Sequence, residues 1–177
     1  MAHFSRKRVA ELVAVARNGA TSHEKGRALQ DVSCHLFATI PGVRPPLCNV
    51  VDFAEGGEID IFLANKAQKN GLWFLPHAIL VECKNWAQPV GSQDVRVFMD
   101  RMRERACEVG ILIAANGVTG NAEDLNAARR HIARALQDGY HILVITLDEI
   151  AAADGGAAVI ELLEQKWMPL KSFLASV

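Results

Sequence analysis

The stretch from Gly57 to Lys84 places ionisable residues within two apolar segments, and this pattern strongly limits how the chain can fold. The first segment reads Gly-Glu-Ile-Asp-Ile-Phe-Leu (57–63), and the second reads Ala-Ile-Leu-Val-Glu-Cys-Lys (78–84). Short apolar runs separated by a polar turn are typical of strands. A buried ion lowers the free energy of unfolding by several kcal/mol unless a partner or a metal compensates it. These charges therefore need a specific structural or chemical reason.

The alternation of side chains along a strand predicts which of these residues meet. Glu82 and Lys84 share one face of their strand, while Cys83 points to the opposite face. Glu58 and Asp60 share a face of the earlier strand in the same way. If the two strands pair through the polar loop between them, Asp60 approaches Glu82.

Two neighbouring carboxylates repel, and each raises the pKa of the other. A hard divalent cation such as Mg²⁺ relieves this repulsion, because it accepts carboxylate oxygens, keeps several waters and binds substrate phosphate. Lys84 would then face that water or that phosphate. The group of Asp60, Glu82 and Lys84 is thus equipped for metal-assisted phosphodiester hydrolysis. The structural alternative is a half-buried salt-bridge cluster at the end of a sheet.

The spacing of these residues resembles the core motif of the PD-(D/E)XK nuclease superfamily. Asp60 precedes Glu82-Cys83-Lys84, which ends an apolar strand, and Gly91-Ser92-Gln93-Asp94-Val95 follows like the helix start of Mrr-like restriction endonuclease domains. A helix begins near Lys25 and an apolar strand begins at Gly110. The resemblance covers roughly residues 21–150. One departure is Ile59, which stands where the family name has proline.

The resemblance implies a role for each residue of the motif. Asp60 and Glu82 would bind Mg²⁺, with Mn²⁺ as a possible substitute, helped by the backbone carbonyl of Cys83. Lys84 would stabilise the phosphate or lower the pKa of the attacking water. Gln93 would orient that water.

A second departure from the family lies in the preceding helix. Relatives often carry glutamate at the position of Gln30, where it assists the metal site, but here the residue is an amide. Gln30 lies one residue off the apolar stripe of its helix, either as a catalytic residue at the site or as a partly exposed amide. Glu24, about a turn and a half earlier, is a candidate to replace the missing carboxylate.

The periodicity of the chain predicts an α/β fold. Apolar spacing predicts helices, and short apolar runs predict strands. The order resembles a restriction-endonuclease-like αβββαβ core with a central mixed β-sheet flanked by helices. We expect one nuclease-like domain over residues 1–177, with an N-terminal helix in 1–20, the core in 21–150 and a C-terminal helix in 157–177. The expected elements are helices at 4–16, 22–38, 92–106, 122–137 and 158–173, and strands at 49–54, 57–63, 78–84, 110–115 and 141–146.

The composition of the chain limits its expected location, the state of its cysteines and the role of its arginines. The chain has no apolar run long enough to span a membrane and no secretory leader, so a cytoplasmic location is expected. The four cysteines lack a paired short spacing and are expected to be free thiols. The arginines of the 92–106 helix are mixed with acids, as on a solvated face, and the same interpretation is favoured for Arg129, Arg130 and Arg134.

The resemblance implies a Mg²⁺-dependent DNA endonuclease, with a role in restriction or defence by analogy. The net charge of −1 gives no global attraction to DNA, so binding requires local patches or a partner protein that supplies DNA recognition. A homodimer is expected because cleavage of both strands needs two sites. The alternatives are a catalytically inactive nuclease-fold module for binding or assembly, and a structure-specific resolvase like those of Holliday junctions.

Overall fold

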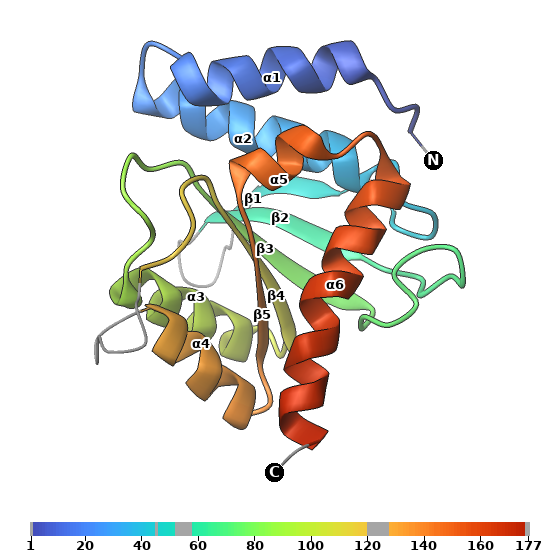
Figure 1. Ribbon diagram of the computed structural model, residues 1–177, viewed down its shortest axis with the longest axis vertical. Coiled ribbons are helices and arrows are strands. Elements are labelled where there is room, and N and C mark those ends of the chain that lie inside the picture. Colours follow the sequence, from blue (N-terminus) through green and yellow to red (C-terminus); the bar gives the residue numbers. More distant parts are fainter. Residues whose placement is uncertain (1, 45, 52–57, 120–127, 176–177) are drawn as a thin grey trace.

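A five-stranded mixed sheet forms the centre of the protein. The computed structural model describes residues 2–44, 46–51, 58–119 and 128–175 (Figure 1). In chain order the elements are α1 (Arg6–Asn18), α2 (Ser22–Phe37), β1 (Leu47–Val51), β2 (Glu58–Ala64), β3 (Ala78–Lys84), α3 (Ser92–Glu104), β4 (Val109–Ala114), α4 (Ala128–Gln137), β5 (His141–Ile145), α5 (Leu147–Ala152) and α6 (Gly156–Ala175).

The strands lie in the order β1-β2-β3-β4-β5. The first three form an antiparallel meander, and β4 and β5 add in parallel to β3. The two parallel connections contain α3 and α4 and therefore cross over the sheet, as parallel pairing requires. The predicted α/β class, the mixed sheet and the αβββαβ order are confirmed.

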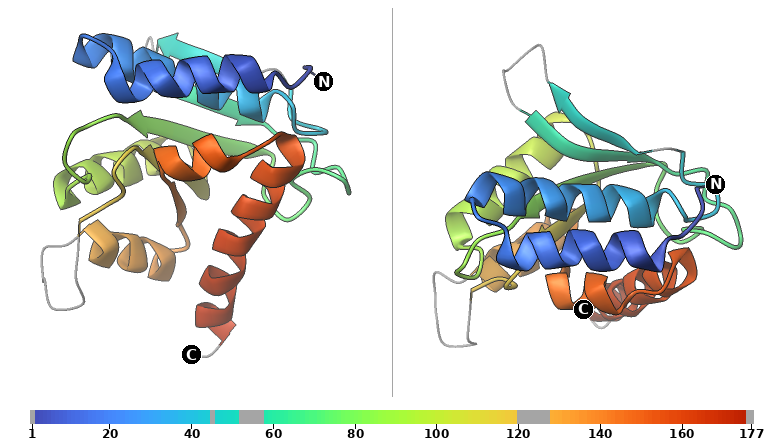
Figure 2. Two further views of the ribbon diagram at one scale, coloured as in Figure 1. Left: turned by 45° about the horizontal axis from the view of Figure 1, so that its top comes forward. Right: turned by 90° about the horizontal axis from the view of Figure 1, so that it is seen from above.

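Helices cover both faces of the sheet (Figures 1 and 2). Alternation along β3 sends Ile79 and Val81 into a core shared with α1, α2, α5 and α6, and sends Leu80 into a second core under α3 and α4. β4 is buried along its whole length, because both of its faces are covered. Glu82 and Lys84 lie at the end of β3, the strand between the antiparallel and parallel parts of the sheet.

Gly110 allows α3 to pack unusually close to β4. A Cβ atom at this position would lie 2.5 Å from Sδ of Met102 and 2.7 Å from Cζ of Phe98, both of which are buried residues of α3. Such distances are well inside van der Waals contact. The missing Cβ at Gly110 thus leaves room for the Phe98 and Met102 side chains of α3 against β4.

Several element ends differ from the expected ones. The first strand begins two residues earlier, at Leu47, and its expected end lies in 52–57, outside the described residues. The expected start of the helix at 122 also lies outside them. The last helix begins at Gly156 rather than 158, and Pro169 lies within it. None of the described helices has the length and apolarity needed to cross a membrane.

The expectation of four free thiols is wrong for one pair. Cys34 of α2 and Cys48 of β1 form a disulfide, whereas Cys83 and Cys107 are free. The two bonded residues are 14 positions apart, and only the packing of α2 beside β1 brings them together. Sequence spacing alone carries no sign of that packing.

Removal of this disulfide should destabilise the fold. The Cys34→Ser/Cys48→Ser variant should lose about 3 kcal/mol in free energy of unfolding, because closing a loop of about 15 residues restricts the unfolded chain by that amount. Urea unfolding of the variant and the oxidised protein measures the difference. Thiol titration of the denatured, unreduced protein should find two reactive thiols, and a count of four would contradict the assignment.

Candidate active site

The candidate site lies where β2 separates from β3. The ladder between these strands ends at the pair Ile61 and Val81, so Asp60 and Glu82 are the next residues on each strand. The backbone N–H of Cys83 donates to Oδ2 of Asp60 over 2.7 Å. The Asp60 side chain thus takes the place of a strand partner at the point where the backbone pairing stops.

Gln30 of α2 holds the other oxygen of Asp60. Its Nε2 donates to Oδ1 over 2.6 Å. Burial raises the pKa of Asp60 and the charge of Glu82 raises it further, against smaller opposing effects of the Cys83 N–H, Lys84 and Gln30. The predicted approach of the two carboxylates is therefore found, and the raised pKa of Asp60 agrees with the expected repulsion.

Glu82 is a buried carboxylate, 5% exposed, between two cations. The Nζ of Lys84 lies 2.8 Å from Oε1. The Nη1 of Arg101 donates to both oxygens, over 2.9 Å to Oε1 and 2.8 Å to Oε2. Two cations on one buried carboxylate offset the cost of removing it from water.

The sequence did not identify Arg101 as part of this group. Arg101 was expected on the solvated outer side of α3, but its side chain is only 30% exposed and reaches β3. It lies three positions after the buried Phe98, at the edge of the core-facing side of the helix. The contact of Arg101 with Glu82 also depends on how α3 packs against β4, where Gly110 leaves room for its side chains. The position of Arg101 on the helix and this glycine predict the contact only when they are considered together.

Gln93 and Glu24 lie apart from these contacts. Gln93 is exposed in the first turn of α3, and among the described residues no hydrogen bond joins it to Asp60, Glu82 or Lys84. Glu24 belongs to the capping box of α2, where its Oε2 accepts from the backbone N–H of Thr21. Glu24 is thus occupied at the start of the helix and does not replace the carboxylate that Gln30 lacks.

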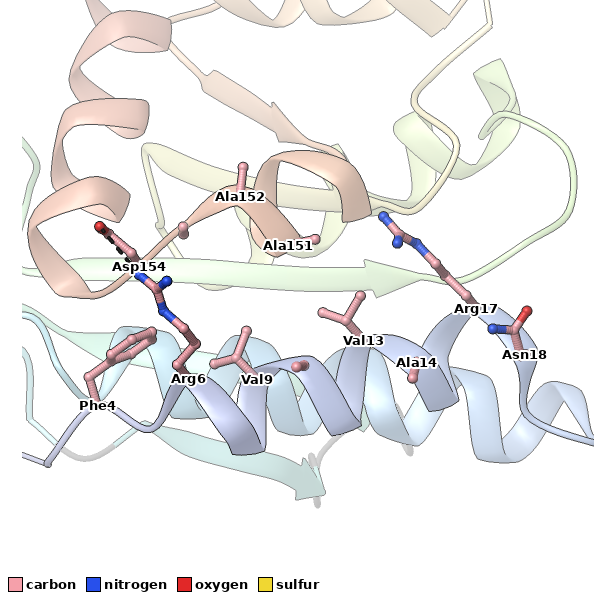
Figure 3. Close-up of a pocket in the computed structure, with 12 residues that line it drawn as sticks. Phe4, Arg6, Val9, Val13, Ala14, Arg17, Asn18, Ala151, Ala152 and Asp154 are labelled. Atoms are coloured by element: carbon pink, nitrogen blue, oxygen red, sulfur yellow. Dashed lines mark ion pairs between the residues drawn. The ribbon is translucent and has the colours of Figure 1, made fainter.

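A recess elsewhere in the molecule lacks the acids and cations of the candidate site. About 530 Å³ in volume, it separates α1 from α5 (Figure 3). Valine and alanine side chains line much of it, and the exposed ion pair of Arg6 and Asp154 crosses one end. The recess does not hold the convergent acids and cations, which lie at the edge of β3.

A comparison with known families identifies the family of the chain. A family model described as restriction endonuclease, Mrr_cat, matches residues 24–152. That range holds the five described strands and the described partners of Asp60 and Glu82, which are Gln30, Cys83, Lys84 and Arg101. The chain belongs to this restriction endonuclease family. No curated protein and no solved structure gives a significant match.

Membership of the Mrr_cat family confirms the resemblance inferred from the sequence. It identifies a nuclease-type domain, and the match runs from the first turn of α2 to the end of α5. α1 and the whole of α6 lie outside the matched range, although both contribute to the core on the α2 side of the sheet.

The oxygen donors at the site suit a hard divalent cation. Two carboxylates, Asp60 and Glu82, converge, and the carbonyl of Cys83 lies on the β2 side of its strand, as its N–H does. Carboxylate and carbonyl oxygens are ligands that Mg²⁺ and Mn²⁺ accept. Within the described residues no group of three or more His, Cys, Asp or Glu side chains gathers, so waters and substrate would have to complete the coordination.

Proposed function

We propose that this protein is a metal-dependent DNA endonuclease that hydrolyses phosphodiester bonds. The observation that carries the proposal is the convergence of Asp60, Glu82 and Lys84 at the point where β2 leaves β3. In a family of restriction endonucleases, two acids and an amine at such a point match the requirements of phosphodiester hydrolysis.

Asp60, Glu82 and the carbonyl of Cys83 would hold the ion, with Mg²⁺ as the expected cofactor and Mn²⁺ as a substitute. A bound ion would supply Lewis-acid polarisation of the phosphate and a more acidic water. Gln30 and the Cys83 N–H fix the orientation of Asp60 through one hydrogen bond to each oxygen. Such fixed orientation lowers the cost of arranging the site for the reaction.

Lys84 would stabilise negative charge on the phosphate or lower the pKa of the attacking water. It is held beside Glu82 and is about one quarter exposed, so its Nζ is restrained yet accessible. Arg101 brings a second cation to the same carboxylate. These cations supply local attraction for phosphate that the net charge of −1 does not. Gln93 would contribute to the site only if binding of the substrate moved its side chain towards Lys84.

A second candidate is a DNA-binding or assembly module that does not cut. Gln30 favours it, because the position lacks the carboxylate of many relatives. The engagement of both Glu82 oxygens by Arg101 favours it as well, because this contact competes with metal ligation. Family analogy extends the first proposal in four ways: cleavage restricted to branched DNA, a role in defence, a homodimer, and a partner protein for DNA recognition.

Cleavage assays separate these functions. The purified protein should convert supercoiled plasmid to nicked or linear DNA in Mg²⁺ or Mn²⁺ and should leave it intact in EDTA. Parallel reactions with single-stranded and four-way branched DNA distinguish a general endonuclease from a structure-specific one. DNA binding without cleavage in either metal would favour the inactive module and contradict the proposal.

A further inference from the structure

A second recess, about 280 Å³ in volume, lies at the carboxyl ends of the three parallel strands. Ligands of open α/β sheets commonly bind at this edge. The C-terminal end of α1 and the first turn of α2 close it from the side. The polar and aromatic residues that line it are Arg17, Lys25, Asn85, Trp86, Asn116 and Asp148.

Trp86 connects this recess to the candidate active site. It follows β3 by two residues, its side chain is 43% exposed, and the Nζ of Lys84 lies 5.5 Å from the centre of its ring. The Lys84 ammonium thus lies over Trp86, so the ring that lines the recess also borders a residue of the candidate active site.

The walls of the recess are held by hydrogen bonds before any ligand binds. The Nδ2 of Asn85 donates to the carbonyls of Ala16 and Lys25, over 2.9 and 2.7 Å. The amide of Asn116 donates to the carbonyl of Trp86. These bonds join the ends of α1 and α2 to the chain that leaves β3 and β4. A prearranged recess loses less entropy when it binds a ligand.

The charges at the rim suit a phosphate. Arg17 is paired with Asp148 over 2.6 Å across the opening, and Figure 3 shows its side chain reaching away from α1 towards α5. No carboxylate among the described residues forms an ion pair with Lys25, which is half-buried at the recess. Lys25 therefore offers a positive charge in the same recess as the partly exposed ring of Trp86.

We propose that this recess binds one unpaired nucleotide base of the DNA substrate, stacked on Trp86, with the adjoining phosphate against Lys25. The inference rests on the proposed function and specifies its substrate class as DNA with an unpaired nucleotide near the cut. Small side chains, Ala16, Ala87 and Ala115, leave space for a flat group. An inorganic anion would not use the aromatic wall. A paired base lies inside the duplex stack and reaches such a recess only after leaving it.

Binding measured without cleavage tests the inference. Fluorescence anisotropy in Ca²⁺ compares a fully paired duplex with the same duplex carrying one extra unpaired nucleotide. The wild-type chain should prefer the second by about tenfold, the scale of stacking one base on an aromatic side chain. Trp86→Ala should abolish the preference and change affinity for the paired duplex by less than about twofold. Lys25→Gln should weaken binding of the unpaired nucleotide and reduce the salt slope by about 0.7.

Trp73→Ala is the matched control. Trp73 is 58% exposed but lies in the connection that leads into the start of β3, whereas Trp86 follows its end. This variant should keep the wild-type preference. Equal affinity of the wild-type chain for both DNAs, failure to bind either, or identical behaviour of the two tryptophan variants would overturn the inference. Plasmid cleavage in Mg²⁺, measured in parallel, tests the endonuclease separately. A preference for the unpaired nucleotide without cleavage would support the base-binding recess but not the endonuclease. Cleavage without that preference would overturn the base-binding recess and leave the endonuclease supported.

Discussion

Lys84→Ala should lower the rate of DNA cleavage by about 100- to 1,000-fold, the usual loss when one preorganised charge-stabilising group is removed from a site. Lys84 is a restrained cation at the end of β3, with its Nζ 2.8 Å from Glu82 Oε1. Its ammonium is well placed to face charge that develops on a phosphate. Arg101 remains on Glu82 in this variant, so the buried carboxylate keeps a partner and the fold should be retained.

The measurement is single-turnover cleavage of plasmid in Mg²⁺, with circular dichroism and thermal unfolding to verify the fold. Lys69→Ala is the control, because Lys69 is an exposed lysine of the loop between β2 and β3. It should cleave at the wild-type rate. Wild-type cleavage by Lys84→Ala would remove this residue from the mechanism and leave Glu82 and Lys84 as a structural ion pair.

The central pair of carboxylates was predictable because strand geometry is regular. Once β2 and β3 are antiparallel neighbours, their register fixes Asp60 near Glu82, and the period of two sets the face of Lys84. Gln30 became a candidate through the family resemblance, while its place at the edge of the apolar stripe left a partly exposed amide equally open; its hydrogen bond to Asp60 is found. The pair of carboxylates depends on local periodicity and on one strand pairing, whereas Gln30 needed the resemblance.

Arg101, the Trp86 recess and the disulfide depend on how separate elements approach in space. Arg101 reaches Glu82 through the packing of α3 on the sheet, and Gly110 contributes to that packing by leaving room for Phe98 and Met102. The recess needs the ends of α1 and α2 to meet the chain after β3. Such contacts follow from helix packing, for which the sequence of one segment carries no sufficient signal. Chemistry was therefore easier to predict along strands than between helices.

Asp60→Asn should weaken Mn²⁺ binding by about 100-fold or more and reduce cleavage accordingly. Loss of a group that only hydrogen-bonds to a metal ligand already costs about 10- to 100-fold in metal affinity, and Asp60 is proposed as a direct ligand. Titration calorimetry with Mn²⁺ and no DNA measures this apart from activity. Asp31→Asn is the control, because Asp31 follows Gln30 on α2 but pairs with Arg27 on its own helix. Unchanged Mn²⁺ affinity in Asp60→Asn would contradict the assignment.

The pH dependence of stability gives an independent test of Asp60. Burial and the charge of Glu82 raise its pKa above the ordinary value of 3.8 in the folded state. Between 3.8 and that higher value, the native chain binds more protons than the unfolded chain, so the free energy of unfolding from this group falls as pH rises. The contribution is fully present below the unfolded pKa and is lost as pH passes the folded pKa. In Asp60→Asn, this decrease in the free energy of unfolding with rising pH should disappear, as urea unfolding across the pH range measures. An unchanged dependence on pH would mean that Asp60 is not the carboxyl that takes up the proton.

Metal binding should weaken over the same interval as pH decreases, because the ligand must be ionised.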